Sequence, residues 1–257
     1  MPSQPDEPAR SWRHTPPDAV RAAAEHYFGE GLARAQRYAE LLATDGVVRG
    51  LIGPREAPRL WERHLLNSVA VAERIPDGAS VVDVGSGAGL PGIPLAIARP
   101  DLTVVLLEPL LRRATFLEEV VAALGLERVS VMRARAEDAA DRLSPAEVVV
   151  SRALAPLDRL AAWCLPLTAV GGHVVAVKGA SAAEEAETHQ AAVRRAGGAD
   201  PVVDVCGASM LDPPATVIDI RRDRAVRAGP DRAVQTGLPG VQSGGNRRSR
   251  GPRGGPR

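Results

Sequence analysis

An apolar run ends in a glycine-rich turn at Val81-Val82-Asp83-Val84-Gly85-Ser86-Gly87-Ala88-Gly89-Leu90. The run predicts a buried strand, because valine packs well on a pleated, buried surface. The glycines allow a tight turn and a close approach to a ligand, because they carry no Cβ atom. A helix that follows such a turn presents its amino terminus to the ligand. The segment therefore predicts a strand, loop and helix that together hold a nucleotide-like cofactor.

The spacing of the glycines distinguishes between two cofactor classes. In the dinucleotide fingerprint the third glycine follows the second by three residues, and that position is Leu90 here. In this chain the third glycine, Gly89, comes one residue earlier. We therefore expect S-adenosylmethionine rather than NAD, with Gly85, Gly87, Gly89 and Leu90 as cofactor-binding residues.

Length and composition are those of one large α/β domain with extensions, since the chain has 257 residues, 45% of them hydrophobic. The sequence has no apolar run of eighteen residues and no signal-peptide pattern, so we expect a cytoplasmic protein with no membrane association. The two cysteines, Cys164 and Cys206, lie in apolar segments without ligand-like neighbours. We expect neither a disulfide nor a metal site from them. A monomer is the expected state.

Charge is distributed unevenly along the chain. The formal net charge is +1, yet Arg221 to Arg257 contains ten arginines and only two aspartates. We predict a disordered Arg/Gly-rich tail at 224–257, because such a composition buries too little apolar surface to fold. Two interpretations of the tail stay open, namely electrostatic attraction to nucleic acid and a solvated extension without a role. Residues 1–17 are predicted to be a flexible leader.

Periodicity divides the rest into two parts. Residues 18–78 predict a helical segment packed on the core, with helices at Ala19–Phe28, Ala33–Leu42 and Pro58–Ala72. Residues 79–223 predict a doubly wound, mostly parallel sheet whose last two strands form an antiparallel hairpin. The expected strands are Val81–Val84, Thr103–Glu108, Val129–Arg133, Val148–Ser151, Val174–Lys178, Val202–Cys206 and Val217–Arg221. This arrangement resembles the Rossmann-like, seven-stranded fold of class I S-adenosylmethionine-dependent methyltransferases.

Ligands of such sheets lie beyond the carboxyl ends of the strands, and acidic residues follow two of them here. Glu108 ends the second strand about twenty residues after the turn, where a carboxylate can accept hydrogen bonds from ribose hydroxyls. After the third strand, Ala136 and Glu137 are candidates for the adenine site. A surface glutamate at 108 is the alternative that we consider weaker.

The fourth strand ends in Ser151-Arg152-Ala153, where the methyl acceptor normally lies in such enzymes. Enzymes that methylate an exocyclic amine place Asp/Asn-Pro-Pro-aromatic here, and this chain does not. Carbon methylation commonly needs a cysteine nucleophile, and neither cysteine falls at this point. With these two kinds of acceptor disfavoured, we expect an acceptor atom that already carries a free lone pair, such as a ring nitrogen. Catalysis is then mainly alignment of the reactants, without a covalent enzyme intermediate. Arg152 is the candidate for positioning cofactor or substrate; a structural ion pair is the alternative.

Several basic residues are candidates for contacts with RNA. Lys178 is the only lysine of the chain, which suggests that an ammonium is required there, to contact phosphate or substrate. His64 is a candidate for an RNA or cofactor contact, with a packing role equally open. A basic rim around the cleft is expected from Arg112, Arg113, Arg133, Arg135 and Arg152.

The glycine loop and four further motifs resemble the ribosomal RNA small subunit methyltransferase G family, also called glucose-inhibited division protein B. The loop runs on as Leu90-Pro91-Gly92-Ile93-Pro94-Leu95, with two prolines in or beside the first helix. The other motifs are Trp61-Glu62-Arg63-His64-Leu65-Leu66-Asn67-Ser68, Arg112-Arg113 with Phe116-Leu117, Val150-Ser151-Arg152-Ala153 and Val177-Lys178-Gly179. The resemblance covers roughly Ala19 to Arg221. Asn67 departs from it, since the family often has aspartate there.

The resemblance implies methylation of guanine N7 at one position in 16S ribosomal RNA, with S-adenosylmethionine as donor and the RNA or small ribosomal subunit as partner. It implies that Gly85 and Leu90 line the methionine and ribose side of the cofactor, Ala136 and Glu137 its adenine, and Arg152 the floor of the cleft. A methyltransferase that acts on a small molecule or another RNA is the alternative. A non-catalytic scaffold and an NAD oxidoreductase are weaker.

Overall fold

The computed structural model describes residues 15–226, and these fold as one unit. Most of the predicted leader and nearly all of the predicted tail lie outside the described residues. Within 15–226, no helix is long and apolar enough to cross a membrane.

A single seven-stranded sheet organises the described chain, in the order β3-β2-β1-β4-β5-β7-β6. The strands are β1 (Ser80–Val84), β2 (Thr103–Leu107), β3 (Val129–Met132), β4 (Ala146–Arg152), β5 (Thr168–Val177), β6 (Val202–Cys206) and β7 (Ala215–Arg221). The first five strands pair in parallel, whereas β7 runs antiparallel to both β5 and β6. The predicted fold class and the antiparallel hairpin are confirmed.

Valine runs form the centre of the sheet because both of its faces are covered. Val81 and Val150 point to one side and pack in the larger apolar cluster, while Val82 and Val149 point to the other side. All four side chains are buried. Continuous β-branched runs are typical of parallel strands that are covered on both faces.

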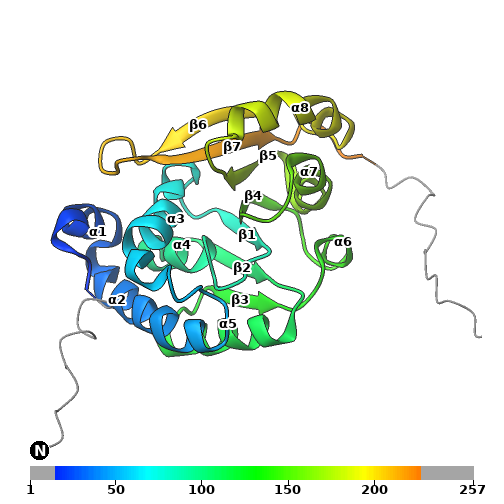
Figure 1. Cartoon of the computed structure of the whole chain (residues 1–257). Helices are drawn as coiled ribbons and strands as arrows, with labels where there is room; N and C mark the ends of the chain where they lie inside the picture. The colour runs from blue at the N-terminus through cyan, green and yellow to red at the C-terminus, as the bar shows by residue number, and fades with distance from the viewer. Residues whose placement is uncertain (1–14, 227–257) are drawn as a thin grey trace, which may run out of the picture. The chain divides into compact units, whose positions relative to one another are not determined.

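The helices fall into two layers (Figure 1). One layer joins the N-terminal helices to α4 (Gly92–Ala98) and α5 (Leu111–Leu124), and the other consists of α6 (Ala136–Ala139), α7 (Leu157–Cys164) and α8 (Ala182–Arg195). The active-site loops leave the carboxyl ends of the strands, between these layers.

The N-terminal segment is helical but irregular. It begins with α1 (Arg21–Phe28) and α2 (Leu32–Leu41). The predicted helix Pro58–Ala72 is instead a succession of 3-10, π and α turns, with a wide π turn at Leu60–Leu66 and the short α3 at Asn67–Val69. Side chains described below donate hydrogen bonds to the backbone carbonyls of Glu62, Arg63 and His64 in this wide turn.

Candidate active site

Glycines are required in the loop that follows β1. Gly85, Gly87 and Gly89 have φ values of +73°, +58° and +102°, a region that residues with a Cβ rarely adopt. A Cβ on Gly89 would lie 2.6 Å from Ile93 Cγ1, whereas one on Gly87 would meet nothing closer than the Gly85 carbonyl oxygen at 3.8 Å. Gly87 therefore faces open space, as a residue that approaches a ligand must.

Side chains from distant segments support this loop. The buried Tyr38 of α2 donates a hydrogen bond from its hydroxyl to the carbonyl oxygen of Ala88 at 2.8 Å. Ser86 Oγ donates to the carbonyl oxygen of Asp83 at 2.9 Å. The N-terminal segment thus contributes directly to the shape of the loop.

Glu108 lies next to the loop, as the sequence predicted for a ribose-binding carboxylate. Its two oxygens accept hydrogen bonds from the backbone N–H of Gly87 and of Leu110, each at 3.0 Å. The side chain is 2% exposed, and a nitrogen of Arg113 lies 3.8 Å from it. Each carboxylate oxygen can accept more than one hydrogen bond, so capacity remains for two hydroxyl groups.

Asp83 is a residue of this site to which the sequence analysis gave no role. Its Oδ2 accepts a hydrogen bond from the N–H of Gly92 at 3.0 Å, and Oδ1 is buried without a hydrogen-bond partner in residues 15–226. Burial raises the pKa of this carboxyl group to about 7. A charged residue inside an apolar strand was the signal that could have identified it.

The predicted adenine-site residues begin α6, at the carboxyl end of β3. Ala136 is buried, Glu137 is half-buried and Arg135 is exposed. Because β3 and β2 are neighbours in the sheet, these residues lie at the same edge as Glu108. Their contact with adenine stays a prediction.

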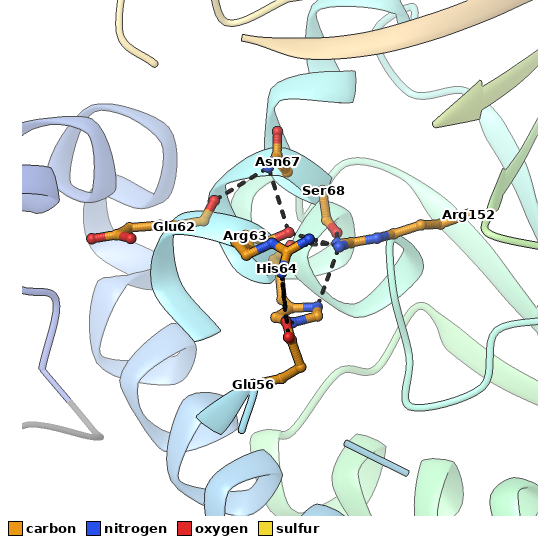
Figure 2. A network of polar contacts seen from close by, with 7 residues as sticks. All are labelled: Glu56, Glu62, Arg63, His64, Asn67, Ser68 and Arg152. Atoms are coloured by element: carbon orange, nitrogen blue, oxygen red, sulfur yellow. Dashed lines mark hydrogen bonds and ion pairs between the residues drawn. The ribbon is translucent and has the colours of Figure 1, made fainter. Parts of the chain in front are cut away.

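Arg152, at the end of β4, reaches the N-terminal segment (Figure 2). One terminal nitrogen donates to the carbonyl oxygen of His64 and to Ser68 Oγ, both at 3.1 Å, and the other donates to the carbonyl oxygen of Arg63 at 2.6 Å. These partners are backbone and hydroxyl oxygens rather than the carboxylate that the alternative interpretation envisaged. Arg152 therefore positions the segment 63–68 against β4.

His64 continues this network (Figure 2). Its Nδ1 lies 3.2 Å from a terminal nitrogen of Arg152, and its Nε2 lies 3.0 Å from Glu56 Oε2. Arginine has only donors, so Nδ1 accepts and Nε2–H donates to the glutamate. Burial and the Arg152 charge lower the pKa of His64. The geometry supports the packing role that the sequence left open.

The structure shows how an asparagine fits at position 67, where the resembling family often has aspartate. The side-chain amide of Asn67 donates to the carbonyl oxygens of Glu62 and Arg63, at 3.3 and 3.4 Å (Figure 2). An ionised aspartate has no N–H donor. The Asn67 amide has one and donates to backbone carbonyls of the wide turn.

Lys178 directly follows β5, which is separated by β4 from β1 and its glycine loop. Its ammonium donates to the carbonyl oxygen of Ala155 at 2.8 Å and to Glu185 Oε1 at 2.7 Å. The pair lines a cavity of about 510 Å³ between the loop that follows β4 and the first turns of α8. Lys178 is thus part of an ion pair rather than a free ammonium.

The basic residues do not form one continuous rim. Arg112, Arg113, Arg133 and Arg135 follow β2 and β3, whereas Arg152 ends β4, and β1 separates the two groups in the sheet. The sequence placed all of them correctly at carboxyl ends, but strand order divides them.

Both cysteines are buried, and burial raises the pKa of each thiol. Cys164 ends α7, and Cys206 ends β6 at the edge of the sheet. Within residues 15–226, no group of three or more His, Cys, Asp or Glu side chains is placed to hold a metal ion.

Comparison with known proteins agrees with this geometry. The profile of the family described as rRNA small subunit methyltransferase G matches residues 32–211. The Ribosomal RNA small subunit methyltransferase G of Salinispora tropica is 60% identical over 218 residues, which cover 82% of this chain and 90% of that protein. The protein of the same name from Corynebacterium efficiens is 56% identical over 214 residues, which cover 82% and 92% of the two chains.

A solved structure supports the fold. Mitomycin 7-O-methyltransferase superposes with a TM-score of 0.52 at 16% sequence identity, covering 81% of this chain and 74% of that chain. With relatives at 60% and 56% identity and a family profile over most of the described residues, the expected methyltransferase is confirmed: this chain belongs to the rRNA small subunit methyltransferase G family.

Proposed function

We propose that this protein transfers a methyl group from S-adenosylmethionine to N7 of one guanine in small-subunit (16S) ribosomal RNA. The reaction is an in-line displacement without a covalent enzyme intermediate. Family membership supports a ribosomal RNA substrate. The chemistry at the end of β4 supports the choice of N7.

The loop that follows β4 carries no carboxylate, imidazole or thiol beside the place where the acceptor atom is expected. Residues 151–157 are Ser-Arg-Ala-Leu-Ala-Pro-Leu, without an acid, a histidine or a cysteine. An exocyclic amine needs acceptors for its protons, and a carbon acceptor needs a nucleophile. Guanine N7 needs neither, because its lone pair is free. This observation carries the proposal.

The residues around the glycine loop fit S-adenosylmethionine. Glu108 offers buried carboxylate oxygens beside Gly87, whose missing side chain leaves open space. Glu108 would hold the ribose, Gly85, Gly89 and Leu90 the methionine and ribose side, and residues 136 and 137 the adenine. The cofactor supplies an activated methyl group, and the protein supplies alignment.

Arg152 and the segment it holds would set the position of the substrate. Its guanidinium is largely buried and donates four hydrogen bonds to one short segment, at Arg63, His64 and Ser68. This makes it a positioning residue, which holds the N-terminal segment beside the place where the acceptor must lie. Arg112, Arg113 and Arg135 would contact phosphates on the cofactor side of the sheet, since guanidinium groups suit phosphate recognition.

The decisive experiment uses small-subunit particles that lack the modification. The purified protein is incubated with them and with labelled S-adenosylmethionine, and the RNA is digested to nucleosides. We expect label in 7-methylguanosine at a single site. Label in another nucleoside would support RNA methyltransferase activity but reject guanine N7 as the acceptor. Label only in a pool of small molecules would support the alternative, a methyltransferase that acts on a small molecule.

A further inference from the structure

The cavity beside Lys178 lies where an acceptor base is needed. It opens at the carboxyl ends of the neighbouring strands β4 and β5, and Leu154 and Lys178 line it. Leu154 also reaches the cofactor loop, because its Cδ1 lies 2.4 Å from the position of a Cβ on Gly85. Only the side chain of Leu154 therefore separates a base in the cavity from the glycine loop. The cavity is an open surface depression of about 510 Å³ rather than an enclosed pocket.

The loop that forms one wall is held in an unusual conformation. Ala153 has a φ of +48°, which is uncommon for a residue with a Cβ. Its neighbour Ala155 then turns its carbonyl oxygen to Lys178. Backbone strain of this kind is concentrated at binding sites, where surrounding contacts maintain it.

The polar groups of the cavity are arranged in a way that disfavours phosphate. Lys178 is paired with Glu185 at 2.7 Å, and the side chains are only 10% and 17% exposed. Glu184 lines the same cavity. Two carboxylates beside one ammonium repel an anion, so the phosphate contact that the sequence suggested for Lys178 is not supported.

The same pair matches the Watson–Crick edge of guanine. Two of the three N–H donors of Lys178 are used by Ala155 and Glu185, which leaves one for the O6 acceptor. The Glu185 carboxylate has lone pairs for N1–H and for the 2-amino group. Adenine would present an acceptor to this carboxylate and would be repelled. N7 lies on the opposite, Hoogsteen edge, so a guanine held in this way keeps its methylation site free.

We propose that this cavity is the acceptor-base subsite, in which Glu185 and Lys178 read the Watson–Crick edge of an unstacked guanine. Enzymes that act on a base commonly read it along this edge after taking it out of the stack. The inference rests on the proposed function, because it names the part of the protein that selects guanine for N7 methylation.

The test compares guanosine with inosine, which lacks only the 2-amino group. Small-subunit particles are reconstituted on RNA that carries either nucleoside at the position labelled above. For the unmodified protein we expect kcat/KM to fall on the order of tenfold or more with inosine, since a hydrogen bond to a carboxylate is lost. In Glu185→Gln the ratio between guanosine and inosine should approach one, because one of the paired acceptors becomes a donor.

Matched controls separate this role from a structural one. Glu187→Gln, exposed on α8 two residues away and outside the lining of the cavity, should keep the full ratio. Cofactor affinity and the thermal midpoint of Glu185→Gln should stay near those of the unmodified protein; if that variant does not fold, Glu185→Met takes its place. A full guanosine preference in the Glu185 variants, or no preference in the unmodified protein, would overturn the inference. Label outside 7-methylguanosine in the earlier experiment would instead reject the proposed function.

Discussion

Glu108 shapes the glycine loop, and we propose that the same side chain binds the ribose of the cofactor. The Glu108 carboxylate accepts the N–H of Gly87 from the loop and the N–H of Leu110 from its own strand end. The remaining lone pairs of the carboxylate are available to the ribose hydroxyls, which is the role that the spacing in the sequence suggested. A binding measurement tests this role.

We expect Glu108→Gln to weaken S-adenosylmethionine binding by about tenfold to a hundredfold, because hydrogen bonds to a charged acceptor contribute about 1.5–3 kcal/mol. Isothermal titration calorimetry measures the affinity, and Glu118→Gln, exposed on α5, is the control. Unchanged affinity in a folded Glu108→Gln protein would remove Glu108 from the site.

Asp83 gives a pH prediction. Its native pKa of about 7 lies above the value of about 4 in an unfolded chain. The native state therefore binds more protons between these values, and the free energy of unfolding falls as pH rises from 4 to 7, by roughly 2–4 kcal/mol. Asp83→Asn should lose this part of the pH dependence. Urea unfolding at pH 4.5 and 7.5 measures it, with the exposed Asp45→Asn as control; equal pH dependence in all three proteins would contradict the prediction.

Sequence could identify such residues only in part. The position of Glu108 beside the glycine loop was predictable, because a residue that ends a parallel strand lies at the ligand edge of such a sheet. Its contact with ribose stays a prediction. The partners of Arg152 were not predictable, since they lie 84 to 89 residues earlier in the chain. No local pattern encodes a contact of that separation.

At the scale of elements, the strands were predicted where valine runs are continuous, as in β1 and β2. β5 begins at Thr168 rather than at Val174, because Gly171 and Gly172 have the composition of a turn although the sheet continues through them. The helix expected at Pro58–Ala72 breaks into unlike turns, since tertiary contacts of its carbonyls replace regular helical bonds.

The contact between β4 and the N-terminal segment makes a prediction about elements. Arg152→Lys keeps the charge but cannot reach all the oxygens that the guanidinium contacts. We expect a loss of about 2–4 kcal/mol in unfolding free energy and a larger increase in amide hydrogen exchange at 57–74 than in β1 to β3. Hydrogen exchange with mass spectrometry measures this, and Arg159→Lys, exposed on α7, is the control. Unchanged exchange at 57–74 would show that other contacts hold the segment.

At the scale of the whole molecule, the described chain ends by packing on the end of α8 and the turn that follows it. Arg224 donates to the carbonyl oxygen of Arg194 at 3.0 Å, and a Cβ on Gly197 would lie 2.8 Å from Val226 Cγ2. The predicted tail began at 224, but these contacts place two of its residues, Arg224 and Val226, against the folded part. A truncation that spares the fold should follow Val226.

Residues 227–257 contain seven arginines and one aspartate. Their removal should raise the apparent KM for the RNA substrate by about tenfold at low salt and by less at high salt, because counterion release drives such binding. Turnover at saturating RNA should stay nearly unchanged. Steady-state kinetics at two ionic strengths measures both; lost turnover at saturation would assign the tail a catalytic role.

The contacts between Arg152 and residues 63–68 form late during synthesis of the chain. The N-terminal helices leave the ribosome first, yet their anchor is translated 84 to 89 residues later. Until β4 has emerged, the carbonyl oxygens of Arg63 and His64 lack the hydrogen bonds that Arg152 donates to them. The growing chain therefore fixes the segment 63–68 only after residue 152 has been made, and a nascent chain stalled before that residue would hold those helices without the Arg152 contacts.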